Sequence, residues 1–265
     1  MELIDTHAHI YPDAIALKAA ESIGEFYKMD IAADGRLATL LERGQKAGIG
    51  KHLVHSVGIT PARVAHINDY LMRTAAAYPD RLVGFGTMHP GLPDVRAELR
   101  RIKAGGLRGV KVHPDFQHFE LDSDEAVAMF RALAEEGMPA LVHTGDTRYT
   151  YSQPARMARA LKAVPDVKAI CAHLGGWSVW NEAWKQLADL PNVWVDTSSS
   201  LYALKPDEAV AIIRRYHGDR VFFGTDYPMW DPVEERARFD ALPLTATERE
   251  NITHKNFEKF LKGLD

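Results

Sequence analysis

The sequence reads LIDTHAH at residues 3–9, a β-rich run that ends in two histidines. Similar runs, each followed by a helical stretch, recur about every 31 residues, which is roughly the length of one βα unit. We predict strands at Leu3–His7, His52–Val57, Leu82–Thr87, Gly109–His113, Ala140–Thr144, Lys168–His173, Val193–Thr197 and Arg220–Thr225. Eight alternating βα units predict a parallel sheet closed into a (β/α)8 TIM barrel, with residues 1–265 as a single domain.

The segments between these strands carry helix signals. Pro61 opens a helical stretch at Ala62–Tyr78, and Thr245 with Glu248 has capping-box spacing before the last amphipathic stretch. Residues 12–34 are rich in Ala, Glu and Lys, and they predict a helical insertion near the barrel mouth. No G-x-G-x-x-G motif follows the first strand, which argues against an open dinucleotide-binding sheet.

The composition favours a globular protein over a nucleic-acid-binding or membrane protein. The chain is 46% hydrophobic and 26% charged with a formal net charge of -4, which is typical of a globular protein and argues against a nucleic-acid binder. No apolar run approaches the roughly 18 residues of a membrane span, so we expect no membrane partner. The one cysteine, Cys171, falls inside a predicted strand and is interpreted as a core residue. We expect a cytoplasmic location and a small-molecule substrate, and we leave a homodimer open.

Histidines and one aspartate lie where predicted strands end. These side chains, with one lysine, are His7, His9, Lys111, His113, His143, His173 and Asp226. The carboxyl ends of the strands in such a barrel meet at one face, where the chemistry sits. His7 and His9 are two residues apart, so both project from the same side of an extended chain and can meet one metal ion. Imidazole and carboxylate ligands suit Zn²⁺, and also Mn²⁺, Fe²⁺ or Co²⁺.

Each of these residues also has an ordinary structural interpretation. Asp226 is compatible with a turn or helix cap, and His173 with a core histidine that hydrogen-bonds a backbone carbonyl. Lys111 is compatible with a buried lysine paired with an acid such as Asp115. Their combination at strand ends favours a metal site.

Five segments occur in the order typical of the amidohydrolase superfamily. They are IDTHAH at residues 4–9, KVHP at 111–114, VHT at 142–144, AHLGG at 172–176 and GTDYP at 224–228. The chain therefore resembles this superfamily from residue 4 to the final helix. It is most similar to the amidohydrolase-related branch that includes aminocarboxymuconate-semialdehyde decarboxylase.

The resemblance implies roles for the residues at the strand ends. One divalent metal would be bound by His7, His9, His143 and Asp226. We expect Zn²⁺ first, with Mn²⁺, Fe²⁺ or Co²⁺ as alternatives. His173 and Asp226 would be the catalytic residues, while Lys111 and His113 would bind substrate or support the ligands. Binuclear members carry a carboxylated lysine on strand four, so Lys111 could bridge a second metal, but we favour one metal.

The loops at the predicted mouth suggest a flat substrate. Tyr149 and Trp177 follow strands five and six, and Arg148 could pair with a substrate carboxylate. The same residues could instead pack loops or a subunit interface.

Two reactions fit this set of residues. The leading hypothesis is hydrolysis of an amide, lactone or ester of a small substrate by a metal-activated water. The alternative is metal-dependent, non-oxidative decarboxylation of an aromatic or unsaturated carboxylic acid. A nuclease of the TatD type would need an acidic metal ligand at strand four, where this chain has Lys111 and His113, so we do not favour it. A degenerate barrel without catalytic activity would lack one of the metal ligands, and none is missing from the sequence.

Overall fold

All eight predicted strands are present in the computed structural model, which describes residues 3–264. They are β1 (Leu3–His9), β2 (Ile49–His55), β3 (Leu82–Gly84), β4 (Gly86–Thr87), β5 (Val110–Val112), β6 (Ala140–Val142), β7 (Ala169–Cys171), β8 (Val193–Asp196) and β9 (Val221–Phe222). The third predicted strand is observed as two pieces, β3 and β4, on either side of Phe85. Most strands are shorter than predicted, and β5 and β7 are shorter at both ends.

The strands are parallel and form a closed barrel. They pair in the orders β1-β2-β3 and β4-β5-β6-β7-β8-β9, and Phe85 N–H donates to Val54 O while Gly86 N–H donates to Gly109 O. The ring closes where Thr6 N–H donates to Phe223 O at 2.9 Å and His9 N–H donates to Tyr227 O at 2.7 Å. The predicted (β/α)8 TIM barrel is therefore confirmed.

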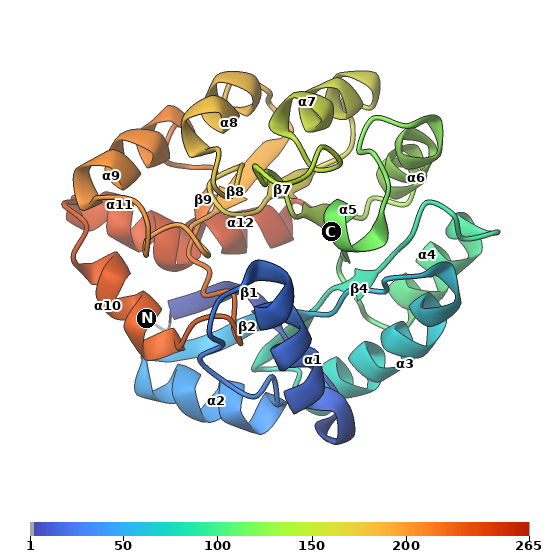
Figure 1. The fold of residues 1–265 in the computed structure, drawn as a ribbon, viewed down its shortest axis with the longest axis horizontal. Helices are drawn as coiled ribbons and strands as arrows, with labels where there is room; N and C mark the ends of the chain where they lie inside the picture. Colours follow the sequence, from blue (N-terminus) through green and yellow to red (C-terminus); the bar gives the residue numbers. More distant parts are fainter. Residues whose placement is uncertain (1–2, 265) are drawn as a thin grey trace.

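Helices surround the barrel on its sides and at both of its ends (Figure 1). They are α1 (Asp13–Tyr27), α2 (Leu37–Lys46), α3 (Pro61–Ala77), α4 (Val95–Ala104), α5 (Pro114–Gln117), α6 (Asp124–Glu135), α7 (Pro154–Ala163), α8 (Trp180–Leu187), α9 (Pro206–Arg215), α10 (Pro232–Asp240), α11 (Ala246–Glu250), the π-helical turn η1 (Asn251–Lys255) and α12 (Asn256–Lys262). Pro61 is the first residue of α3, and Thr245 with Glu248 forms the predicted capping box of α11. None of the helices in residues 3–264 is long and apolar enough to cross a membrane.

Apolar side chains fill the end of the barrel that lies opposite the carboxyl ends of the strands. Ile4, Leu53, Phe85, Leu141, Ile170 and Phe222 form one buried cluster with Phe257 and Phe260. The last two belong to α12, which therefore closes this end of the barrel. Because this end is sealed by hydrophobic packing, polar side chains can converge only at the opposite end.

The pairing of β1 with β2 sets which side chains face the barrel axis. The register shifts between Asp5 and Ala8, so β1 has an irregularity there. As a result Ile4 belongs to the apolar layer and His7 lies in the polar layer above it, although they are three residues apart. Further along, His9 pairs directly with His55 of β2.

Residues 12–34 contain α1, which lies in front of the barrel in Figure 1. Its carboxyl-terminal residue, Tyr27, lies 2.8 Å from His113 Nε2 through its hydroxyl group. This contact places the end of α1 over the carboxyl ends of the strands.

Cys171 of β7 is completely buried, and burial raises the pKa of its thiol. This is the environment of a core residue.

Candidate metal centre

His7 is held in one orientation by a carboxylate from β8. Its Nδ1 donates to Asp196 Oδ2 at 2.9 Å, and both side chains are completely buried. A proton on Nδ1 leaves the lone pair of neutral imidazole on Nε2, as in many histidines that bind metals. His7 Nε2 therefore faces the barrel mouth as a potential ligand.

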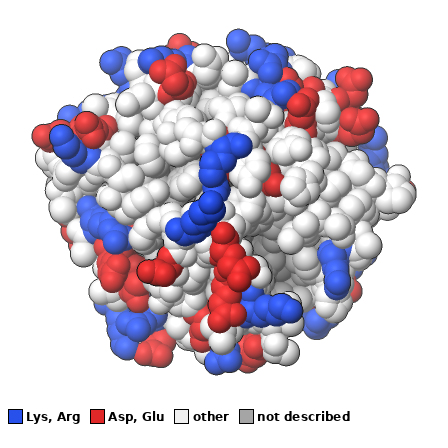
Figure 2. Space-filling view, viewed as in Figure 1, with Lys and Arg blue, Asp and Glu red and all other residues white. Residues whose placement is uncertain are grey.

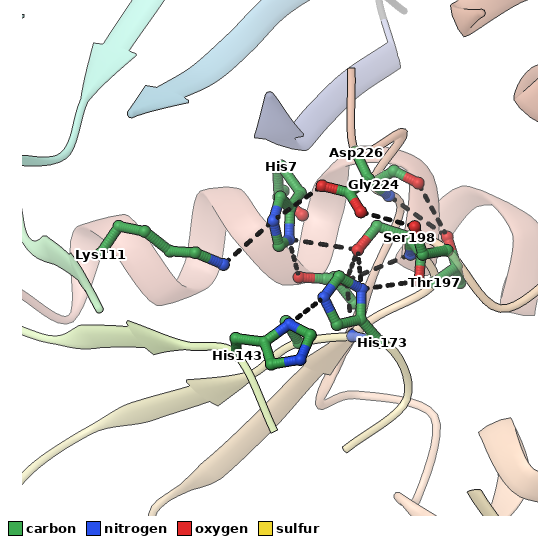
Figure 3. A network of polar contacts seen from close by, with 12 residues as sticks. His7, Lys111, His143, His173, Thr197, Ser198, Gly224 and Asp226 are labelled. Carbon is green, nitrogen blue, oxygen red and sulfur yellow. Dashed lines mark hydrogen bonds and ion pairs between the residues drawn. The ribbon is translucent and has the colours of Figure 1, made fainter. Parts of the chain in front are cut away.

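Asp226 brings two imidazoles to one point. Its Oδ1 lies 3.3 Å from His7 Nε2 (Figure 3) and 3.4 Å from His9 Nε2, and its Oδ2 accepts from Ser199 Oγ at 2.5 Å. Asp226 has a left-handed backbone, with φ 60°. Burial by itself would raise its pKa, but the neighbouring imidazoles of His7 and His9 outweigh it and hold the pKa well below the ordinary value. Asp226 is thus a carboxylate that can face a cation.

Gly224 leaves the space that this arrangement needs. A Cβ atom at Gly224 would lie 3.0 Å from His7 Cβ and 3.2 Å from Ser198 Cβ. A larger residue would therefore require His7 or Ser198 to shift by a few tenths of an ångström.

His143 and His173 form a second imidazole pair. His143 Nδ1 lies 3.0 Å from His173 Nε2, and His143 Nε2 lies 3.1 Å from Gly145 O. On the other side, His173 Nδ1 lies 3.1 Å from Ser198 O and 2.9 Å from Ser198 Oγ. Burial lowers the pKa of His173 to about 4 and that of His143 well below its ordinary value, so both are neutral near pH 7. As a metal ligand, His143 would have to exchange one of its two contacts for the ion.

Lys111 reaches the same point from β5. Its Nζ lies 3.1 Å from His7 Nε2, and Figure 3 shows its amino group pointing at that ring. Burial lowers its pKa to about 8, against the opposing effect of Asp226 and Asp196. These carboxylates, and not Asp115, are the acids that act on Lys111.

His113 is occupied on both ring nitrogens. Nδ1 accepts from Phe116 N–H at 3.3 Å, and Nε2 contacts the Tyr27 hydroxyl. The ring stacks on His143 with 3.9 Å between centroids. In this arrangement His113 supports its neighbours and has no free nitrogen for an ion.

Arg148 joins α1 to the loop after β6. Its guanidinium pairs with the buried Asp146 at 2.7 Å and donates to Phe26 O at 2.6 Å. It also lies 4.8–5.5 Å from the ring centroids of the aromatic residues Phe26, Tyr27, Tyr149 and Trp177. The predicted pairing of Arg148 with a substrate carboxylate would require it to leave Asp146, and it stays a prediction.

The polar side chains surround a small cavity. Those that line it are His9, Tyr27, Lys111, His113, His143, His173 and Asp226, and its volume is about 20 Å³. This is room for about one water molecule. An adjoining cavity of about 10 Å³ is lined by Tyr27, His143, His173, Trp177 and Asp226 among others. Most of the predicted site residues therefore lie around these two adjoining cavities, with His7 beside them, whereas Arg148 and Tyr149 do not line either one.

The residues present fit a divalent metal ion. Asp226 Oδ1 already lies near His7 Nε2 and His9 Nε2, and the bond from His7 Nδ1 to Asp196 leaves the lone pair of that ring on Nε2. A set of neutral imidazoles with a carboxylate matches the ligands of Zn²⁺ and related ions.

Four residues of the site were not found by sequence reasoning. Asp196 and His55 lie inside predicted strands, while Ser198 and Tyr27 lie in loop and insertion segments. The period of two along a strand could have found the first two, because Asp196 follows Trp194 and His55 follows the inward-facing Leu53. No comparable signal marks Tyr27.

Comparison with known proteins places the chain in a family. The amidohydrolase family model matches residues 4–263, so the chain belongs to the amidohydrolase family. The resemblance to the amidohydrolase superfamily inferred from the motifs is thereby confirmed. No curated protein sequence matches the chain.

Solved structures share the whole fold. An uncharacterized TIM-barrel protein from Bordetella bronchiseptica has a TM-score of 0.81 and 22% identity, over 100% of this chain and 99% of that one. A 5-carboxyvanillate decarboxylase from Sphingomonas paucimobilis has a TM-score of 0.73 and 14% identity, over 98% and 99%. A dihydroxybenzoic acid decarboxylase from a Polaromonas species, solved with manganese and 2-nitroresorcinol, has a TM-score of 0.73 and 16% identity, over 98% and 97%.

Proposed function

We propose that the protein is a metal-dependent carboxy-lyase that removes CO₂ without oxidation from a small aromatic carboxylic acid. The observation that carries the proposal is the approach of His7, His9 and Asp226 to one point beside a cavity that also exposes Lys111 and His173. The structurally similar decarboxylases from Sphingomonas and Polaromonas support decarboxylation as the first candidate reaction, ahead of the hydrolysis that was the leading hypothesis from the sequence.

The walls of the site suit a flat ring that carries negative charge. Tyr27 and Phe116 line the cavity, and Lys111 contributes a buried amino group for a carboxylate or phenolate. On the face shown in Figure 2, acidic and basic side chains lie around the rim and in a band across the centre, and much of the surface between them is uncharged.

The residues divide the chemistry as follows. Bound between His7, His9 and Asp226, with His143 as the fourth predicted ligand, a divalent ion would supply Lewis-acid chemistry to a substrate oxygen. A proton adds to the ring carbon that bears the carboxylate; the bond to the carboxylate then breaks, and its electron pair restores the aromatic ring as CO₂ leaves. His173 would relay that proton from water to the ring carbon through Nε2, because Ser198 O accepts from Nδ1 and leaves the lone pair of the neutral ring on Nε2.

A substrate needs more room than the cavity offers. About 20 Å³ holds a water molecule but no aromatic ring. A surface groove of about 630 Å³ runs between α1 and α3, and Tyr11 in its wall stacks on His9. We infer that α1 moves away from the mouth to admit substrate.

A metal-dependent hydrolase is the second candidate. The Asp226 side chain is 13% exposed, so water can reach the carboxylate, which could accept its proton. Metal-loaded protein should be incubated with aromatic carboxylic acids, lactones and amides, and both CO₂ release and hydrolysed product measured. CO₂ release that a chelator abolishes supports the carboxy-lyase, and hydrolysis without CO₂ would replace it with the hydrolase.

The variant His173→Ala tests the assigned role of His173. It should keep its metal and lose about 10²–10⁴ in rate if His173 transfers a proton. Loss of metal in that variant would favour the binuclear arrangement instead.

A further inference from the structure

His55 is a buried histidine for which the proposed chemistry has no use. It is the last residue of β2, two positions after the inward-facing Leu53, and its side chain is completely buried. Neither Nδ1 nor Nε2 has a hydrogen-bond partner among the residues that the structure describes. A buried polar group without a partner costs free energy, so this position calls for a ligand.

The ring lies against both histidines of β1. Its centroid is 4.3 Å from that of His9 and 4.8 Å from that of His7, edge to face in both cases. One ring nitrogen from each of the three residues lies within 4.8 Å of the others. His9 Nδ1, on the neighbouring ring, also has no partner among residues 3–264.

The backbone holds this cluster together. His9 and His55 are paired residues of the parallel strands β1 and β2, so the distance between them is set by the barrel itself. His7 is fixed by Asp196 on the far side. Small rotations of the rings are therefore enough to bring the nitrogens to one point.

We propose that His55 is a further ligand of the metal centre, which completes a cluster of three imidazoles with His7 and His9 beside the Asp226 carboxylate. The inference rests on the metal centre of the proposed function and adds a residue from β2 to it. Nitrogens on one tetrahedral zinc ion lie about 3.4 Å apart, so rings whose nitrogens are within 4.8 Å of one another need to shift by less than about 1 Å each.

A third imidazole has a consequence for the choice of metal. Imidazole nitrogen favours Zn²⁺ and Co²⁺ over Mn²⁺, which prefers oxygen ligands. With His55 as a ligand, the site should prefer Zn²⁺ or Co²⁺ over Mn²⁺ more strongly than His7, His9 and Asp226 alone would.

The variant His55→Leu tests the proposal. Affinities for Zn²⁺ and Mn²⁺ are measured by competition with a chromophoric chelator, and the visible absorption of Co²⁺-loaded protein reports the ligand set. We expect Zn²⁺ affinity to fall about 10- to 100-fold, a smaller loss for Mn²⁺ and a changed Co²⁺ spectrum. The metal-free variant should be at least as stable as the metal-free wild type, because an unsatisfied imidazole has been removed.

The matched control is His254→Leu. His254 of η1 is also buried, and among residues 3–264 its Nε2 has no partner and it belongs to none of the candidate metal clusters. Its variant should bind both metals as the wild type does. If His55→Leu does not fold, His55→Gln is measured in the same way.

The outcomes separate this inference from the function on which it rests. A His55 variant with wild-type Zn²⁺ affinity and an unchanged Co²⁺ spectrum refutes the role of His55 and leaves the metal centre standing. A wild-type protein that binds neither Zn²⁺ nor Co²⁺ refutes the metal centre, and this inference with it.

Discussion

The variant Asp196→Asn should weaken metal binding although Asp196 is not a predicted ligand. Asp196 Oδ1 accepts from the backbone N–H groups of His173 and Ser198 at 3.1 Å, and Oδ2 accepts from His7 Nδ1. In the variant, the backbone donors would retain the amide oxygen. The amide NH₂ would then face His7 Nδ1 and stabilise the tautomer that carries its proton on Nε2.

The expected loss of metal affinity follows from this change in the tautomer of His7. A proton on Nε2 must leave or move before the nitrogen can bind an ion, and loss of such a supporting carboxylate costs about 10- to 100-fold in metal affinity. This corresponds to about 1.4–2.7 kcal/mol. Asp196 is also structural, because it is buried and accepts from Ser198 Oγ in addition to these three donors, so the affinity must be measured on protein shown to be folded.

The assay is Zn²⁺ competition with a chromophoric chelator, beside urea unfolding of the metal-free proteins. Glu98→Gln is the control, because Glu98 is also a buried carboxylate in a hydrogen-bond network, with Asn68 and Arg101, but lies on α4. It should lose stability and keep its Zn²⁺ affinity. Wild-type Zn²⁺ affinity in folded Asp196→Asn would refute the argument that this carboxylate sets the tautomer of His7.

Three further predictions concern the scaffold. In Gly44→Ala the added Cβ would lie 2.4 Å from His52 Nε2, so urea unfolding should show a loss of about 1–3 kcal/mol; unchanged stability would mean that α2 is free to shift. Burial raises the pKa of Glu235 to about 7, so the folded protein keeps a proton that the unfolded chain releases near pH 4.5. Stability should therefore fall as the pH rises from about 4.5 to about 7, and Glu235→Gln should flatten that slope; identical slopes in the two proteins would contradict the raised pKa. Arg148→Gln removes the contacts to Asp146 and Phe26, so hydrogen exchange in α1 should accelerate about 5- to 30-fold, with α6 as the internal reference, and unchanged exchange would exclude Arg148 as the anchor.

Local patterns were enough to predict the barrel and much of the candidate site. Each strand is a short β-rich run, and each of the residues His7, His9, His143 and Asp226 stands near the end of one. Because all strands of such a barrel run in the same direction, their ends must meet at one face. The motifs could therefore be assembled without any knowledge of the packing.

The patterns were less informative about residues inside strands. Only the last residues of the predicted strands were considered, and two of these predicted ends lie beyond His55 and Asp196. In the structure His55 and Asp196 are the last residues of β2 and β8. In the structure these residues form the layer beneath the mouth, where they contact the rings of His7 and His9.

Contacts between distant segments were decided by the tertiary structure alone. The sequence determined that imidazoles and a carboxylate gather at one end of a barrel, since spacing along a strand sets the side on which a residue lies. Only the closed barrel decided that Asp226 meets His7 and His9, that Arg148 binds Asp146, and that Tyr27 covers the cavity. These contacts depend on the register between strands, on the left-handed turn at Asp226 and on the path of α1, all of which are fixed by packing between residues far apart in the chain.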